Sequence, residues 1–157
     1  MAQEHTYSAT VTWTGNLGAG TAGYKAYTRD HDIACPGKPV IQGSADPAYR
    51  GDASRLNPED MLVAALSACH MLWYLHLCSA AGVIVTAYED SAEGVMQTHP
   101  PEGAGEFTRV TLKPRVTITA ESDAETAERL HETANANCFV ARSVSFPVDH
   151  RPTIVTA

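Results

Sequence analysis

Basic residues are scarce in this sequence, in which 11 lysines and arginines stand against 18 acidic residues and give a formal net charge of −7. A chain of this charge lacks the positive surface that holds nucleic-acid phosphates or anionic lipids by general electrostatics. We therefore expect neither a nucleic-acid partner nor a membrane partner.

Cysteine is scarce too, and four cysteines in 157 residues are too few for a secreted domain held together by disulfides. The sequence contains no Cys-x-x-Cys pair, no glycine-rich phosphate loop ahead of a helix and no serine nucleophile elbow. Its first residues form neither the basic nor the apolar region of a signal peptide. We therefore expect a cytoplasmic protein with reduced thiols, and its four cysteines require an explanation.

The composition is that of an ordinary globular protein, with 44% apolar and 18% charged residues. The sequence has no internal repeat and no low-complexity segment. The length fits one domain of typical size, so we expect a single domain over residues 1–157.

Residues 61–88 contain no aspartate, glutamate, lysine or arginine. The run is long enough to cross a bilayer, but acidic residues flank it on both sides, and it contains two histidines and many alanines. We favour a long helix buried in a protein core, with Asn57 as the N-cap, Pro58 in the first helical position and Gly82 as the C-cap. Because one small domain cannot cover a helix that is apolar nearly all round, we expect a homodimer in which this helix packs against a partner.

Periodic apolar residues on either side of this helix indicate strands, as in residues 110–118, where every second residue is apolar. The expected strands cover residues 7–13, 24–33, 40–42, 83–95, 106–120 and 143–156. A second helix is expected from Ser122, with Glu125 completing a capping box, to about Ala136. This order predicts an α+β fold in which an antiparallel sheet wraps a long central helix.

Cys69 and Cys138 differ in the surroundings that the sequence predicts for them. Cys69 lies about three turns past the N-cap, beyond the reach of the helix dipole, so we expect an inert core residue unless a cation is brought to it. For Cys138 two interpretations stay open. With Asn137 as the N-cap of a helical turn, the dipole and Arg142 would favour the thiolate; otherwise Cys138 ends the preceding helix.

The remaining cysteines and histidines indicate no metal site. Cys78 faces away from Cys69 on the long helix and is expected in the core, and Cys35 lies in a turn. His70 and His76 are six residues apart and point about 120° away from each other, so they do not form a ligand pair. We expect neither a metal ion nor another cofactor.

Two cysteine motifs resemble those of the OsmC/Ohr superfamily, the osmotically induced and organic-hydroperoxide-resistance proteins. The first is Asn-Pro-Glu-Asp-Met-Leu at residues 57–62 with Ala-Ala-Leu-Ser-Ala-Cys at 64–69, and the second is Cys-Phe-Val-Ala-Arg-Ser at 138–143. The order of the expected elements is also similar to that of the family over nearly the whole chain, and the residues around the motifs resemble an OsmC-like subgroup.

This resemblance implies a cysteine-based, peroxiredoxin-like peroxidase that reduces organic hydroperoxides in an antioxidant stress response. Cys69 would attack the peroxide and become a sulfenic acid, and Cys138 would resolve it as an intramolecular disulfide. A dithiol reductant, such as a lipoyl group, would restore both thiols.

The resemblance also implies an activating arginine that is held by the glutamate of the first motif, which Glu59 matches. Arg50 matches the arginine best, Arg29 is the rival, and Arg55 is a weaker third. Because Glu59 precedes Cys69 by ten residues on one helix, the two lie about 15 Å apart along its axis and cannot meet within one chain. We therefore expect two composite sites per homodimer, each completed by a glutamate from the other subunit.

Two positions depart from the family's pattern. Phe139 replaces a proline that is common after the second cysteine, and His70 replaces a frequent phenylalanine after the first. These changes leave the predicted roles of the two cysteines intact and leave the substrate preference and the reductant open. The alternative function is a non-enzymatic protein that uses an apolar pocket of the dimer to bind a lipid or another small ligand.

Overall fold

The computed structural model describes residues 3–99 and 103–157 and divides the chain into two compact units. The first unit is Met1–Met61 and the second is Leu62–Ala157. The single domain expected over residues 1–157 stays a prediction.

The first unit contains a three-stranded antiparallel sheet in the order β1-β2-β3. Its strands are β1 (Thr10–Trp13), β2 (His31–Ala34) and β3 (Ile41–Gly43), and a short 3-10 helix, η1 (Pro47–Tyr49), follows them. The first two strands are shorter than predicted. Residues 24–29 form a loop instead, because the guanidinium of Arg29 donates to the backbone carbonyls of Tyr24 and Tyr27 at 2.9 and 2.8 Å.

The long helix α1 (Pro58–Ala81) begins and ends where the sequence predicts. The side chain of Asn57 accepts the amide of Asp60 at 2.7 Å, and Gly82 ends the helix in the left-handed region with φ 75°. By length and composition α1 could also cross a membrane. The core helix of a soluble protein has the same features, and α1 packs one face into the protein core.

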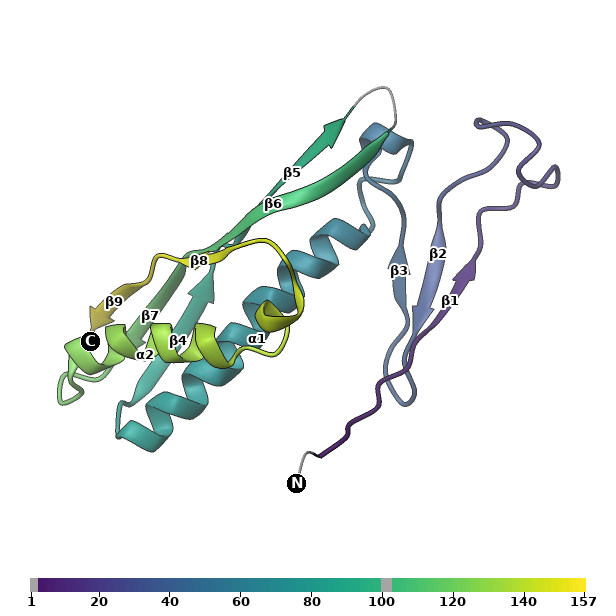
Figure 1. Cartoon of the computed structure of the whole chain (residues 1–157). Helices are drawn as coiled ribbons and strands as arrows, with labels where there is room; N and C mark the ends of the chain where they lie inside the picture. Colours follow the sequence, from purple (N-terminus) through teal and green to yellow (C-terminus); the bar gives the residue numbers. More distant parts are fainter. Residues whose placement is uncertain (1–2, 100–102) are drawn as a thin grey trace. The chain divides into compact units, whose positions relative to one another are not determined.

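The described part of the second unit contains two three-stranded sheets, in the orders β4-β7-β9 and β5-β6-β8 (Figure 1). The strands are β4 (Val85–Asp90), β5 (Glu93–His99), β6 (Ala104–Leu112), β7 (Pro114–Ile118), β8 (Val148–His150) and β9 (Thr153–Thr156). β4 pairs antiparallel with β7, and β5 pairs antiparallel with β6. β9 pairs parallel with β7, and β8 pairs parallel with β6. The α+β class is confirmed, but the pairing is not antiparallel throughout, because the helix between β7 and β8 returns the chain in the same direction.

The helix α2 (Ala124–Asn137) begins at a different cap from the one predicted. The carboxylate of Asp123 accepts the amide of Thr126 at 3.1 Å, so the expected capping box of Ser122 and Glu125 is wrong. The hydroxyl of Ser122 instead accepts the amide of Ile84 at 2.9 Å, and this bond ties the start of α2 to the chain just after α1. A 3-10 helix, η2 (Ala141–Ser143), follows α2.

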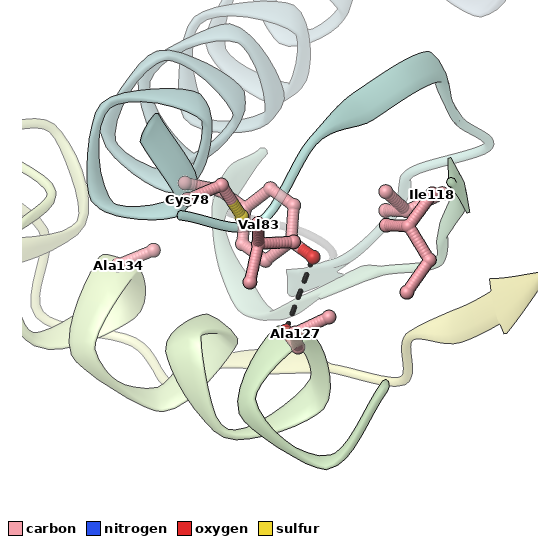
Figure 2. Packing of buried hydrophobic residues seen from close by; sticks show 7 residues of the cluster. Cys78, Val83, Ile118, Ala127 and Ala134 are labelled. Carbon is pink, nitrogen blue, oxygen red and sulfur yellow. Dashed lines mark hydrogen bonds between the residues drawn. The ribbon is translucent and has the colours of Figure 1, made fainter. Parts of the chain in front are cut away.

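The core of the second unit consists of two clusters of buried apolar side chains. The first contains Tyr74, Cys78, Val83, Val116, Ile118, Ala127 and Ala134 (Figure 2), and the second contains Leu66, Val110 and Leu112. The buried face of α1 is a single stripe at helical spacing made of Leu66, His70, Tyr74 and Cys78. His70 therefore lies on α1 between a residue of one cluster and a residue of the other.

Candidate thiol site

The structure brings Cys69 and Cys138 together within the second unit. Cys69 lies on α1 and is half-buried, whereas Cys138 lies at the end of α2 and is only 1% exposed. Burial and, second to it, a hydrogen bond with the side chain of Cys69 raise the pKa of Cys138 to about 11. The two residues, here called the thiol pair, are thus an accessible thiol and a buried, protonated one.

The structure decides between the two interpretations of Cys138. α2 runs through Asn137 and Cys138 is its C-cap, so Asn137 is not the N-cap of a new helical turn. Cys138 therefore lies at the negative end of a helix dipole, which disfavours a thiolate. The amide of Ala141 donates to Sγ of Cys138 at 3.4 Å and offsets this effect only in part, since the pKa remains raised.

Exposed apolar side chains lie next to the thiol pair. Trp73 is one turn beyond Cys69 on α1, and its ring meets the edge of Phe139 with centroids 5.4 Å apart. Phe139, the residue after Cys138, is 69% exposed, and Leu72 is 63% exposed. A shallow hollow of about 250 Å³ lies along this side of α1, lined by Leu72, Trp73 and His76.

The other two cysteines are outside the thiol pair. Cys78 is buried in the first core cluster, as predicted, and burial raises the pKa of its thiol. Cys35 follows β2 directly and accepts the amide of Lys38 at its carbonyl, which confirms its place in a turn.

His70 belongs to a buried cluster that the sequence did not predict. Its Nε2 lies 2.9 Å from Nδ1 of His131 on α2, and its ring is 5.7 Å from that of His150 on β8. The signal for His131 was its position on the buried face of α2, at helical spacing from Ala127 and Ala134. Within residues 3–99 and 103–157, no three histidine, cysteine or carboxylate side chains are arranged to hold a metal ion.

Arg50 lies in the first unit in an unusual backbone conformation. It follows η1 with φ 66°, the left-handed region that few residues other than glycine adopt. Such a conformation costs about 1–2 kcal/mol and is found preferentially at functional sites. The next residue must be a glycine, because a side chain at Gly51 would collide with the carbonyl of Ala45.

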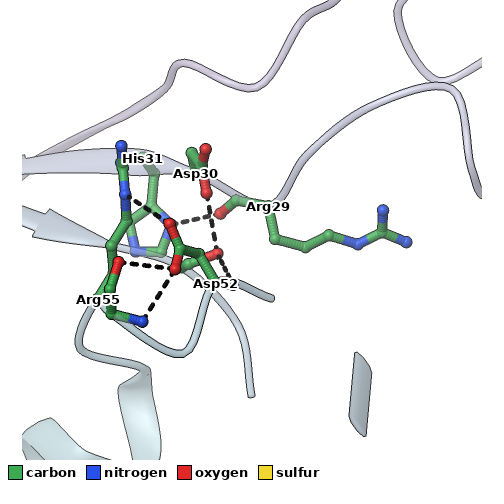
Figure 3. A network of polar contacts seen from close by, with 7 residues as sticks. Arg29, Asp30, His31, Asp52 and Arg55 are labelled. Carbon is green, nitrogen blue, oxygen red and sulfur yellow. Dashed lines mark hydrogen bonds and ion pairs between the residues drawn. The ribbon is translucent and has the colours of Figure 1, made fainter. Parts of the chain in front are cut away.

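A polar network fixes the loop that carries Arg50. The buried hydroxyl of Ser44 donates to Asp30 at 3.0 Å and accepts the amide of Asp52 at 3.0 Å (Figure 3). Asp52 also pairs with Arg55 at 3.5 Å, so the third candidate arginine has a partner inside this loop.

The rival arginine, Arg29, is held by its own loop. Its guanidinium lies 4.3 Å from the ring centroids of both Tyr24 and Tyr27 and donates to both of their carbonyls. Among the described residues, Arg50 is the candidate arginine whose guanidinium has neither an ion pair nor a hydrogen bond. Glu59 is half-buried in the first turn of α1. These residues belong to the first unit, so their approach to Cys69 stays a prediction.

The fold and the thiol pair together define a protein of the OsmC/Ohr type. Residues 51–152 match the family of OsmC-like proteins, and the chain belongs to this family. An OsmC-like protein of unknown function from Vibrio cholerae is 30% identical, with a TM-score of 0.86 over 96% of this chain and 100% of the other.

More distant structures share the fold. An organic hydroperoxide resistance protein from Elizabethkingia anophelis is 17% identical and matches with a TM-score of 0.71 over 100% of both chains. An organic hydroperoxide resistance protein OsmC from Legionella pneumophila is 16% identical, with a TM-score of 0.65 over 98% of both chains. No curated protein matches the chain.

Proposed function

We propose that the protein is a cytoplasmic, cysteine-based peroxidase that reduces organic hydroperoxides. One observation carries this proposal: the half-buried thiol of Cys69 lies beside the buried thiol of Cys138, close enough to help raise its pKa. An accessible attacking sulfur beside a protected second sulfur is the arrangement that a two-cysteine peroxidase requires. The two hydroperoxide resistance proteins that share the fold support the choice of substrate class.

In the first step the Cys69 thiolate attacks the distal oxygen of the hydroperoxide. An S–O bond forms as the O–O bond breaks, so Cys69 becomes a sulfenic acid and the alkoxide leaves and takes up a proton as the alcohol. The sulfur is oxidised by two electrons and the peroxide is reduced by two.

In the second step Cys138 resolves the sulfenic acid. Its sulfur attacks Sγ of Cys69, an S–S bond forms, and the hydroxyl of the sulfenic acid leaves as water with the proton of Cys138. An external dithiol then reduces the disulfide by exchange and restores both thiols. The raised pKa of Cys138 fits this assignment, because the resolving thiol stays protonated until the sulfenic acid has formed beside it.

Arg50 is proposed as the cation that stabilises the Cys69 thiolate, with Glu59 orienting it. Its support is local: Arg50 is held in a left-handed conformation by a fixed loop, and its guanidinium is unpaired within the described residues. Arg29 remains the alternative.

A homodimer is proposed to complete the site. α1 buries only the stripe from Leu66 to Cys78, so apolar residues such as Leu72 stay exposed in the single chain. Glu59 and Cys69 are about 15 Å apart on the helix axis, so a glutamate near Cys69 would come from the partner subunit. Both points favour two composite sites per dimer.

A second candidate function is the binding of an apolar ligand without chemistry. The hollow lined by Leu72, Trp73 and His76 supports it, since apolar walls are typical of ligand sites. In that case Cys69→Ser would leave the biological effect of the protein unchanged.

Steady-state peroxide consumption tests the proposed function. The wild type with dihydrolipoamide should consume cumene hydroperoxide, and Cys69→Ser should abolish turnover. Cys78→Ser is the matched control, because Cys78 is buried away from the pair and should leave turnover unchanged. A wild type that shows no turnover with any dithiol contradicts the proposal.

A further inference from the structure

The bond between His70 and His131 is an unusual element of a helix–helix contact. Both side chains are fully buried, and Nε2 of His70 lies 2.9 Å from Nδ1 of His131. The two rings are nearly parallel, and the ring of His131 also stacks on that of Tyr74 with centroids 3.8 Å apart. We call His70 and His131 the histidine pair.

The histidine pair is poorly explained by packing alone. Nδ1 of His70 and Nε2 of His131 are buried and have no hydrogen-bond partner within the described residues. Whichever ring donates in the shared bond, one N–H and one bare nitrogen remain unpaired at the outer ends. Unpaired buried polar atoms are destabilising, and two apolar side chains of the same shape would avoid this penalty. The presence of two imidazoles at this place therefore indicates a role for the bond between them.

The position of the histidine pair suggests that role. His70 directly follows Cys69 on α1, and His131 lies seven residues, or about two turns, before Cys138 on the same side of α2. The shared bond thus joins the two helices that carry the thiol pair. The other polar link between these helices, the hydroxyl of Tyr74 donating to the carbonyl of Ala127 at 3.1 Å, lies one turn further from Cys138.

A directional hydrogen bond between α1 and α2 fixes the relative position of the two helices more closely than apolar packing does. Apolar packing between α1 and α2, such as that of Ala127 and Ala134, allows one helix to slide or rotate slightly against the other. A hydrogen bond of 2.9 Å between two ring nitrogens sets both the distance and the orientation of the helices. Disulfide formation demands such precision, because the geometry of an S–S bond tolerates little misplacement.

We propose that His70 and His131 are positioning residues that hold the thiol pair in register for the resolution step. The inference rests on the proposed function, since it assigns the histidine pair to one step of that reaction. Neither histidine takes part in the chemistry; each acts through the helix that it anchors. Attack of Cys69 on the peroxide does not involve Cys138 or α2 and should not depend on the bond.

Three variants separate the hydrogen bond from the packing. His131→Phe keeps a ring to stack on Tyr74 and removes Nδ1. His131→Asn keeps a hydrogen-bonding group near the position of Nδ1 and removes the ring. The double variant His70→Phe/His131→Phe removes both imidazoles together, so neither histidine leaves the other unpaired, which protects folding.

Two measurements follow each variant after one equivalent of cumene hydroperoxide. Trapping with dimedone reports sulfenic acid on Cys69, and mass spectrometry of acid-quenched samples reports the rate of disulfide formation. We expect His131→Phe and the double variant to form sulfenic acid at the wild-type rate but to close the disulfide about tenfold more slowly, the effect of about one lost hydrogen bond. His131→Asn should recover most of the wild-type rate.

A third measurement does not depend on peroxidase activity. Equilibration with reduced and oxidised dithiothreitol gives the stability of the Cys69–Cys138 disulfide, which His131→Phe should lower about tenfold and His131→Asn should largely restore. Equal rates and equilibria in the wild type and His131→Phe would overturn the inference, and so would equal defects in His131→Phe and His131→Asn. A wild type that closes the disulfide with dithiothreitol but does not react with peroxide would overturn the proposed function instead.

Discussion

The imidazole of His70 hydrogen-bonds to that of His131 across 2.9 Å, in a core where neither side chain has access to solvent. Burial, and second to it the nearby His150, lowers the pKa of His70 from 6.5 to about 4, with Asp90 opposing the shift. Burial and the two neighbouring histidines lower that of His131 to about 3. Both rings are therefore neutral in the folded protein at pH 7.

The lowered pKa values of His70 and His131 predict that the folded protein loses stability in mild acid. Below pH 6.5 the unfolded chain binds protons on these histidines while the folded chain does not, so stability present above pH 6.5 is lost as the pH falls toward 4. For His70 alone the loss between pH 7 and pH 5 should be about 2 kcal/mol. Urea denaturation at the two pH values measures it, and the double phenylalanine variant should show a smaller difference. If the free energy of unfolding falls by the same amount between pH 7 and pH 5 in the wild type and in the double variant, the loss does not come from the histidine pair.

Tyr74 is buried and Tyr88 is partly buried, and the two tyrosines should respond differently to the loss of a hydroxyl. The hydroxyl of Tyr74 donates to the carbonyl of Ala127, so Tyr74→Phe should lower the free energy of unfolding by about 1 kcal/mol. The hydroxyl of Tyr88 is buried and has no partner among the described residues, so Tyr88→Phe should be neutral or stabilising. Chemical denaturation of the two matched variants is the test, and an equal loss in both would refute the contrast.

Arg50 should show a conflict between stability and activity. Arg50→Gly relieves the left-handed backbone and should raise the free energy of unfolding by roughly 0.5–1 kcal/mol. The same change removes the proposed cation, so peroxide turnover should fall at least about tenfold. Arg129→Ala is the control, because Arg129 is an exposed residue of α2 paired with Glu125. If Arg29→Ala abolishes turnover and Arg50→Gly does not, the rival arginine is the activating one.

A charge on the exposed side of α1 should weaken the proposed homodimer. Leu72→Asp places a carboxylate on a side chain that is 63% exposed in the single chain, so the fold of one subunit should tolerate it. Sedimentation velocity should show dissociation at concentrations where the wild type is dimeric. Ile84→Asp, at a similarly exposed residue outside α1, is the comparison and should leave the dimer intact. A dimer unaffected by Leu72→Asp would mean that this side of α1 is not the interface.

The parts of the fold that follow from local rules were predictable from the sequence. The bounds of α1 depend on an N-cap and a terminal glycine, both of which are visible in the sequence and confirmed by the bonds of Asn57 and by Gly82. The cap of α2 was misplaced by one residue because Ser122 and Asp123 are both good caps locally. A distant amide, that of Ile84, engages Ser122 and leaves the cap to Asp123.

The parts that depend on distant contacts were not predictable in the same way. His70 and His131 are 61 residues apart, and nothing local indicates that their rings meet. The place of Cys138 was open because Asn137 can either cap a helix or end one, and only the packing of α2 decides it. The cysteine motifs predicted which two thiols to examine, and the structure adds their proximity and their unequal exposure.

The central claim is that Cys69 and Cys138 form one redox pair, and peptide mapping by mass spectrometry tests it most directly. The fully reduced protein is treated with one equivalent of cumene hydroperoxide, blocked with iodoacetamide in denaturant so that buried thiols also react, and digested without reductant. We expect a loss of two hydrogens in a peptide pair linking Cys69 to Cys138, with Cys35 and Cys78 alkylated. Recovery of Cys69 and Cys138 as separate alkylated peptides after the peroxide has been consumed would contradict it.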